Sequence, residues 1–272
     1  MLQFISLGSG SSGNSYLLLA DGFGLIIDLG IGIRTFKRSF NNYGLKLPSI
    51  KAVLLTHDHT DHVKAVGALS AELSVPVYAS PEVHASVTAN HHVAKKIPGE
   101  LRRETPVGEP FAVGPFEVTA FKVPHDSADN QGYVIRHGAT TFVLLTDVGH
   151  FTAEAERAVS LATHLVVESN YDPVMLREGR YPARLKGRIS GGCGHVSNPQ
   201  TAEFLAAHLN PALIRNVWLC HLSAENNHPE IAARTVREAL AAAGIPTGTP
   251  EARTRLEALP RRTPSLLQTL EE

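Results

Sequence analysis

Five side chains that can bind metal ions crowd one short stretch of the sequence, Thr56-His57-Asp58-His59-Thr60-Asp61-His62, directly after an apolar run. Three imidazoles and two carboxylates are donors that suit a pair of first-row divalent ions. The spacing lets His57 and His59 bind one ion while Asp61 and His62 turn toward a second. A solvated polar loop is the ordinary alternative for a lone histidine after a strand, but this density favours a metal site.

Residue types that bind metals recur where other apolar runs end. His125 follows the run 121–124, Asp147 ends the run 142–146, and His221 ends the run 217–220. Each of these residues, taken alone, would be interpreted as a turn, cap or surface residue. Because the ends of strands gather the site in α/β sheets, the repeated arrangement predicts that they join the cluster.

The elements that must position these residues alternate between short apolar runs and helical patterns. Strands are expected at 2–7, 16–20, 25–29, 52–56, 75–79, 116–122, 133–136, 141–146, 164–168 and 216–220, and helices at 62–73, 153–161, 199–209 and 229–243. This interleaving predicts an α/β fold. We expect one catalytic domain over residues 1–244 and a loosely ordered C-terminal tail over residues 245–272, which is polar and rich in turn residues.

Composition limits the function class. The 272 residues carry 25 Lys+Arg and 26 Asp+Glu, so any contact with nucleic acid requires a local basic patch. Two cysteines are too few for a disulfide framework and are expected as free thiols. The sequence shows neither a signal peptide nor a long apolar run, which predicts a soluble, cytoplasmic protein with no membrane partner. No pattern indicates the oligomeric state.

In order and spacing, these residues resemble the metallo-β-lactamase superfamily. The stretches Leu7–Ser15, Leu55–Val63, Gly194–Asn198 and His221–Ser223 are similar to the YycJ (WalJ) group of exonucleases within it. The resemblance implies an αββα sandwich of two mixed β-sheets flanked by helices. It also implies two divalent ions, Mn or Zn and possibly Fe: one bound by His57, His59 and His125, the other by Asp61, His62 and His221, with Asp147 bridging them. Asp28 matches the aspartate that supports the site from behind the ligands.

The substrate must be inferred from other residues. Glu168 and His195 resemble a pair that phosphodiesterases of this superfamily use to protonate the leaving oxygen, with His195 as the acid. The loop 8–15 could offer Ser9, Ser11, Ser12 and Asn14 to a phosphate, or could be an ordinary turn between strands. Residues 176–188 hold five basic side chains against one acidic. Of these, Arg184, Lys186 and Arg188 are expected to contact a polyanion, although a solvated loop would have the same composition.

The sequence therefore predicts a metal-dependent phosphodiesterase that uses hydroxide from a water shared by two ions, with Asp61, His195 and Glu168 as catalytic residues. By resemblance it is a 5′-to-3′ exonuclease with DNA as its substrate. The alternative enzyme is a hydrolase of a small ester, thioester, lactone or cyclic phosphodiester, and a non-catalytic binding protein is a third possibility. The short interval from Asp147 to His221 excludes the β-CASP insertion of related ribonucleases.

Overall fold

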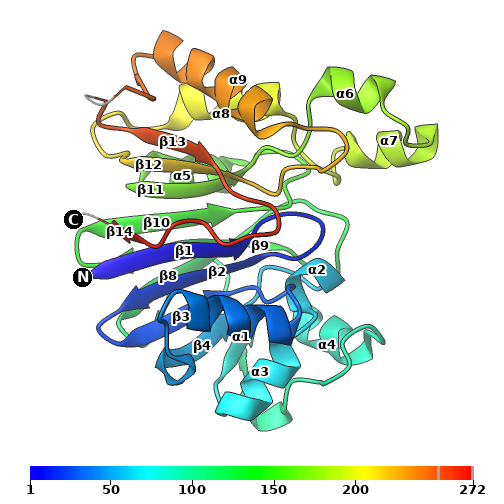
Figure 1. Cartoon of the computed structure of the whole chain (residues 1–272), viewed down its shortest axis with the longest axis vertical. Helices are drawn as coiled ribbons and strands as arrows, with labels where there is room; N and C mark the ends of the chain where they lie inside the picture. The colour runs from blue at the N-terminus through cyan, green and yellow to red at the C-terminus, as the bar shows by residue number, and fades with distance from the viewer. Residues whose placement is uncertain (250–251, 271–272) are drawn as a thin grey trace. The chain divides into compact units, whose positions relative to one another are not determined.

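The computed structural model describes residues 1–249 and 252–270. It contains two mixed β-sheets of seven strands each, flanked by helices, which confirms the predicted fold class (Figure 1). The first sheet has the order β14 (Gln268–Leu270), β1 (Leu2–Gly8), β2 (Ser15–Ala20), β3 (Phe23–Ile27), β4 (Ile50–Leu54), β5 (Val77–Ala79), β6 (Arg102–Glu104). The second has the order β13 (Arg255–Ala258), β12 (Asn216–Cys220), β11 (His164–Glu168), β10 (Thr140–Leu145), β9 (Gln131–His137), β8 (Phe116–Lys122), β7 (Pro110–Val113).

The chain forms two compact units. The first comprises residues 1–120, 127–131 and 260–272, and the second comprises residues 121–126 and 132–259. The single catalytic domain expected over 1–244 is therefore built from two units, and the chain passes between them more than once. Periodicity reveals elements but not which elements share a core, so the sequence did not predict this division.

In the first unit, β1, β2 and β3 run antiparallel, whereas β3, β4, β5 and β6 run parallel. Its helices are α1 (Ile33–Asn42), α2 (Thr60–Val63), α3 (Val66–Leu73) and α4 (Pro81–Ala89), with short 3₁₀ turns at Leu47–Ser49 and Gly99–Leu101. Apolar side chains of the strands pack against those of α1, α3 and α4, including Leu17, Val53, Phe36 and Leu69, all fully buried. This burial holds the end of β4, from which the histidine-rich loop starts, in a fixed position.

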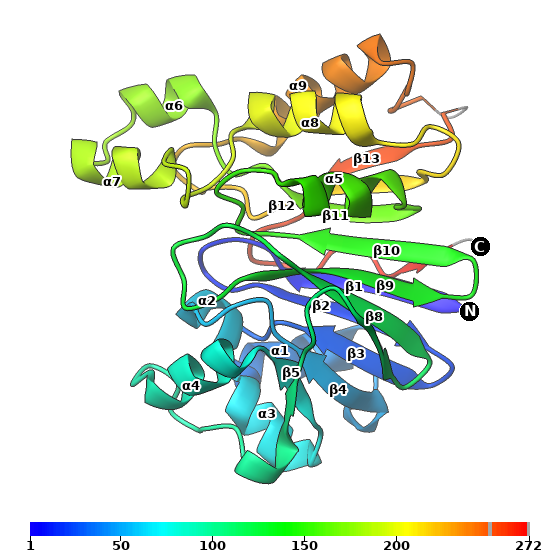
Figure 2. The same ribbon diagram turned by 180° about the vertical axis from the view of Figure 1, so that it is seen from behind.

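In the second unit, β9 and β10 are antiparallel, and β10, β11, β12 and β13 are parallel. Its helices are α5 (Ala153–Ser160), α6 (Pro173–Glu178), α7 (Ala183–Ile189), α8 (Asn198–His208) and α9 (Pro229–Ala242). Helices α5, α8 and α9 cover one face of these strands, whereas α6 and α7 extend away from them (Figure 2). Because the strands are parallel, their carboxyl ends lie at one edge, where Asp147, Glu168 and His221 are found.

The structure corrects the expected tail. Of residues 245–272, positions 250–251 and 271–272 lie outside the described residues, but β13 and β14 each add an edge strand to a sheet. Ser265 is buried, and its hydroxyl accepts a hydrogen bond from the backbone N–H of Ser6 at 3.0 Å. Polar composition suggested a loose segment, but edge strands need few apolar side chains because their backbone hydrogen bonds hold them.

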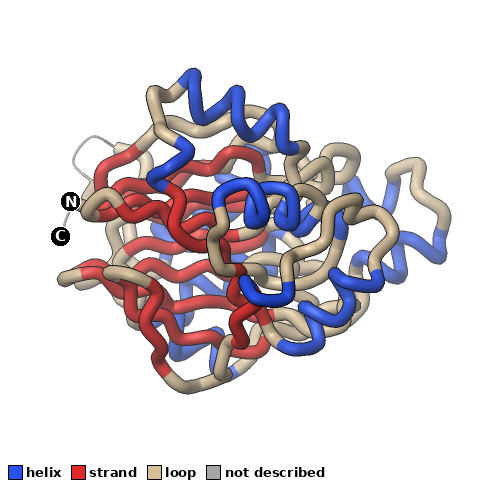
Figure 3. Tube along the Cα trace, turned by 90° about the horizontal axis from the view of Figure 1, so that it is seen from below, coloured by secondary structure: helices blue, strands red, loops and turns tan. Residues whose placement is uncertain are grey.

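Some helices also differ from the sequence prediction. The helix expected over 62–73 is divided into α2 and α3, because the backbone N–H of Ala65 bonds to the carbonyl of Leu29 instead of continuing one helix. The basic segment 176–188, for which no helix was predicted, consists largely of α6 and α7. Figure 3 distinguishes helices, strands and loops of the described residues by colour. Cys193 and Cys220 are free, as predicted. None of the described helices has the length and apolar character needed to cross a membrane.

Candidate metal centre

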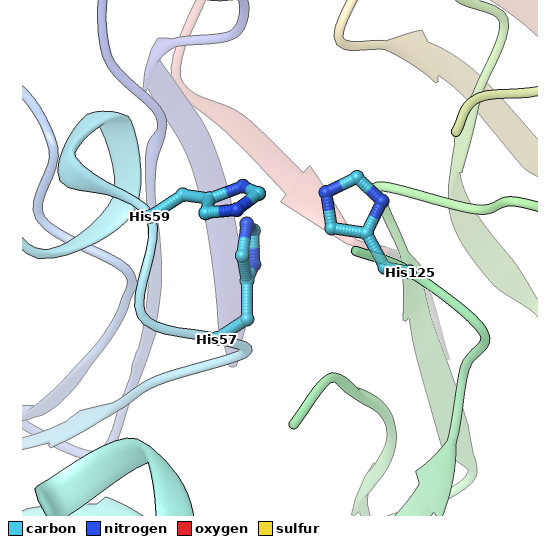
Figure 4. A group of neighbouring side chains, drawn as sticks. All are labelled: His57, His59 and His125. Carbon is cyan, nitrogen blue, oxygen red and sulfur yellow. The ribbon is translucent and has the colours of Figure 1, made fainter. Parts of the chain in front are cut away.

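The histidine-rich loop follows β4 in the first unit. His57 and His59 project from this loop, and Figure 4 draws them together with His125, which follows β8. The ring centroids of His57 and His59 lie 4.7 Å apart, and those of His57 and His62 lie 4.1 Å apart. Asp58, the other acidic residue of the motif, accepts hydrogen bonds from Ser86 and from the backbone of Ala128, so it anchors the loop.

Asp28 contacts this loop through Thr56 and His62. One of its oxygens lies 2.7 Å from Nδ1 of His62 and accepts a hydrogen bond from the hydroxyl of Thr56, and the other accepts one from the Thr56 backbone N–H. All these groups are buried. Since a carboxylate only accepts hydrogen bonds, His62 carries its proton on Nδ1, and its Nε2 is the lone-pair nitrogen.

Asn14 of the glycine- and serine-rich loop and Gly30, which follows β3, both contact the segment that carries Asp61 and His62. Gly30 passes so near α2 that a Cβ atom placed on it would lie 1.6 Å from the carbonyl oxygen of Asp61. The side-chain amide nitrogen of Asn14 lies 2.8 Å from Nε2 of His62, so binding of an ion by that nitrogen requires the amide to rotate. Ser9 is buried with its hydroxyl 3.0 Å from that of Tyr16, whereas Ser11 and Ser12 are exposed. Two of the four predicted phosphate contacts in this loop therefore point into the protein.

The second unit brings together five predicted residues from four separate strand ends and one loop. Oε1 of Glu168 lies 2.9 Å from Nδ1 of His195 and 2.8 Å from Nδ1 of His221. Asp147 is 3.4 Å from His221 and 3.7 Å from Nε2 of His125. One ligand atom from each of Asp147, Glu168, His195 and His221 fits within a group whose members are all within 4.8 Å of one another.

Electrostatics in this cluster favour a charged pair. Burial alone would raise the pKa of the Glu168 carboxyl, but the charge and hydrogen bond of His195, with the hydrogen bond of His221, lower it. For His195, burial disfavours the charged form, yet the Glu168 carboxylate outweighs burial and raises the pKa of the imidazole above its ordinary value. The Glu168 carboxylate thus favours the protonated form of His195.

Three of the strand-end residues have a left-handed backbone conformation, which is uncommon for residues other than glycine. The φ angles are 57° at Asp28, 56° at Asp147 and 52° at His221. Residues held in the left-handed region cluster at functional sites, where the surrounding structure fixes them. Here the conformation turns each side chain at the point where its strand stops.

The donor set fits divalent metal ions by its chemistry. Imidazole nitrogens and carboxylate oxygens suit Zn, Mn and Fe. The imidazoles of His57, His62, His125 and His221 each place Nδ1 against another polar group: the Thr56 hydroxyl, Asp28, the Gly194 carbonyl and Glu168, respectively. In metal sites, such outer hydrogen bonds orient a histidine so that its other nitrogen binds the ion. Both units therefore carry histidines prepared for metal binding through Nε2.

The basic segment is only partly available to a substrate. Arg188 forms an ion pair with Asp126, which also raises the pKa of the Arg188 guanidinium, and Nζ of Lys186 donates to the carbonyl of Arg177 at 2.7 Å. Arg184 is exposed and forms no ion pair with the described residues. Since Asp126 follows His125, Arg188 steadies the neighbour of a predicted ligand.

The sequence reasoning missed two polar residues that hold the site. Thr56 connects Asp28 to His57, and the side-chain amide of Asn170 donates to the carbonyl of His221 at 2.7 Å. Both lie at strand ends, Thr56 after β4 and Asn170 after β11. The rule that found the ligands could therefore have found them, had it been applied to neutral polar residues as well.

Comparison with known proteins agrees with this chemistry. Residues 25–221 match the family model of the β-lactamase superfamily domain. The chain belongs to the metallo-β-lactamase superfamily. It is 32% identical to exodeoxyribonuclease YycJ of Bacillus anthracis, over 91% of this chain and 92% of that protein. It is 31% identical to exodeoxyribonuclease WalJ of Streptococcus pneumoniae, over 90% and 91%. These matches place it in the YycJ/WalJ group.

A solved structure with a similar fold is Zn²⁺-bound PqqB from Methylobacterium extorquens, with a TM-score of 0.72 and 18% identity, covering 98% of this chain and all of that one. At this identity the likeness concerns the fold alone. Family membership makes the chain a metal-dependent hydrolase of the superfamily.

Proposed function

We propose that the chain is a two-metal phosphodiesterase that degrades DNA from a 5′ end, with His195 protonating the leaving 3′ oxygen. The observation that carries the proposal is the buried carboxylate of Glu168, which contacts Nδ1 of both His195 and His221. Glu168 thereby gives two neighbouring imidazoles the same tautomer. Nε2 of His221 remains for a metal ion, and Nε2 of His195 carries a proton that it can give away.

The similarity to the superfamily supports an assignment of metal ligands. His57, His59 and His125 would hold one ion, Asp61, His62 and His221 the other, and Asp147 would bridge them; Mn, Zn or Fe fits these donors. When bound, such ions make hydroxide available near neutral pH and stabilise negative charge on an attacked phosphoryl group. The protein's own part is orientation: Asp28, Thr56 and Glu168 fix the rings, and the buried positions exclude bulk water.

The partial exposure of His195 favours a role as general acid over a role as a structural metal ligand. Its side chain is 19% exposed, whereas those of Glu168 and His221 are almost completely buried, so one edge of the His195 ring remains accessible. A departing alkoxide gains from a proton donor in the transition state, by about 10²- to 10⁴-fold in rate. Lactams and thioesters do not release an alkoxide, so a proton donor formed by His195 and Glu168 favours a phosphodiester substrate. The names of the similar exodeoxyribonucleases support DNA as the substrate and degradation from an end of the strand. We expect the enzyme to act in the cytoplasm.

The decisive experiment compares leaving groups. His195→Gln should lower turnover of end-labelled DNA about 10²-fold or more, while turnover of bis(p-nitrophenyl) phosphate falls far less, because p-nitrophenolate leaves without a proton. Metal content should stay at the wild-type level. The matched control is His91→Gln, an exposed histidine of the first unit.

Equal losses on both phosphodiesters would show that His195 is not the acid. A wild-type protein that hydrolyses lactones or thioesters but shortens no DNA would establish the small-molecule hydrolase instead. Labelling the duplex at the 5′ or the 3′ terminus determines the direction of degradation.

A further inference from the structure

The first unit has a surface cavity of about 350 Å³, distinct from the candidate metal ligands. It is lined by the start of α1, the two residues between α2 and α3, the start of α3 and the segment 92–95. Its volume is within the range of pockets that bind small organic molecules. Ten residues line it: Gly32, Ile33, Arg34, Thr35, Lys64, Ala65, Ala68, His92, Ala94 and Lys95.

The lining combines an apolar floor with a cationic rim. Ile33, Ala65 and Ala68 are the partly or fully buried apolar side chains, and Arg34, Lys64 and Lys95 are exposed. No acidic residue lines the cavity, and these three cations form no ion pair with any described residue. In a chain with a formal charge of −1, such a local excess of positive charge is selective for an anion.

The backbone around the cavity is fixed in place. Gly67 approaches the segment 92–95 so closely that a Cβ atom on it would lie 1.9 Å from the carbonyl oxygen of Lys95. Val93, within the same segment, is buried, and the Lys96 ammonium donates to the carbonyl of Asn90. A cavity that already has its shape loses little entropy when a ligand binds.

We infer that this cavity binds one nucleotide unit of the nucleic-acid strand, away from the bond that is cleaved. The apolar floor suits the face of a base or a deoxyribose, and the three cations suit the phosphates on either side of it. Lys64 directly follows α2, which carries Asp61 and His62, so one short helix connects the cavity to predicted ligands of the same unit. The inference rests on the proposed function, because it places the strand on which that function acts.

Two other cavities lined by described residues fit a nucleotide less well. One of comparable size in the second unit is lined by stacked Phe151 and Phe204, but also by Glu203, and it has no lysine or arginine. One in the strand turn 110–117 is lined by Glu117 and no cation. Only the cavity at α1 joins apolar surface to positive charge without an acidic residue among these three.

The test replaces Arg34, Lys64 and Lys95 together by alanine in the full chain and measures affinity for a labelled dT₁₂ strand by fluorescence anisotropy. Each lost phosphate contact removes about 0.7 of a released counterion, so affinity should fall about fourfold per cation near 0.15 M salt, or about 50-fold for all three, with a flatter salt dependence. The matched control replaces Arg38, Lys46 and Lys51, which are exposed on the same unit outside the cavity. Ala68→Phe, which fills the floor without changing charge, should also weaken binding.

Two further measurements separate the possible failures. If the inference holds, the triple variant raises KM for DNA while kcat and the turnover of bis(p-nitrophenyl) phosphate stay unchanged, because that small substrate does not reach the cavity. Unchanged affinity and salt dependence for dT₁₂ in the triple variant would overturn the inference even if DNA is cleaved. If dAMP bound as tightly as dT₁₂ and only dAMP binding were lost in the variant, the cavity would be a site for free nucleotide, and the strand assignment would be wrong. Absence of DNA cleavage by the wild-type protein would refute the proposed function, and the dT₁₂ measurement would still judge the cavity.

Discussion

Acid should destabilise this protein through His164, a histidine that is not among the predicted metal ligands. His164 starts β11, opposite to the strand end that carries Glu168, and it is fully buried against Trp218, with ring centroids 6.1 Å apart. Burial, with a smaller contribution from the charge of Arg215, lowers the pKa of His164 from 6.5 to about 4. The folded state therefore resists protonation of a group that the unfolded chain protonates readily.

The direction and size of the effect follow from proton linkage. Above pH 6.5 the imidazole is neutral in both states and costs nothing. As pH falls from 6.5 to about 4, the unfolded chain gains a proton that the folded chain does not, so stability is lost. A difference of about 2.5 pKa units corresponds to at most about 3.4 kcal/mol, of which about 2 kcal/mol is lost by pH 5.

Urea unfolding between pH 8 and pH 5, followed by fluorescence of Trp218, the single tryptophan, measures this loss. His164→Gln keeps a polar partner for Thr163, whose hydroxyl lies 2.8 Å from Nδ1 of His164, and should flatten the pH dependence by about 2 kcal/mol. His91→Gln, on an exposed loop, is the control. An unchanged slope in His164→Gln would refute the argument. Nuclease assays below about pH 6 should therefore be accompanied by a stability measurement.

Two further predictions concern residues that contact the predicted metal ligands. Asp28→Asn should weaken metal binding about 10- to 100-fold, because Asp28 fixes the tautomer of His62. Titration with Zn²⁺ or Mn²⁺ measures the affinity. Unchanged affinity would show that His62 does not need the Asp28 carboxylate. Gly30→Ala should lower the free energy of unfolding by about 1–3 kcal/mol or more, because the added Cβ atom would collide with the backbone of Asp61. Gly99→Ala is the control, since the space around Gly99 is open. Equal urea midpoints for the two variants would contradict the close contact at Gly30.

The sequence predicted the strands that carry the ligands because each is a short, continuous apolar run followed by a polar residue. The ends of β4, β10, β11 and β12 all lie within one or two residues of their expected positions. These strands are buried, so burial and pattern give the same answer. The segment around β13 failed for the opposite reason: Arg255 and Glu257 are exposed on an edge strand, and their charge conceals an element that pairing with β12 determines.

Part of the candidate site could not be predicted from the sequence, because it depends on contacts between residues far apart along the chain. That Arg188 pairs with Asp126 depends on a contact across 62 positions, which no local pattern encodes. Ser9 was expected to face a phosphate but lies against Tyr16, because the turn after β1 directs it inward. The residue types near the site could be predicted, whereas the partner of each side chain could not.

The left-handed backbone at Asp28, Asp147 and His221 costs folding stability at three positions whose side chains are predicted to serve the metal site. Glycine at each position would remove about 1 kcal/mol of backbone strain from the folded state. A related protein without hydrolytic activity would therefore be more stable with glycine there. Glycine at these three strand ends is therefore the change by which a relative that keeps the fold but has abandoned catalysis should be recognised.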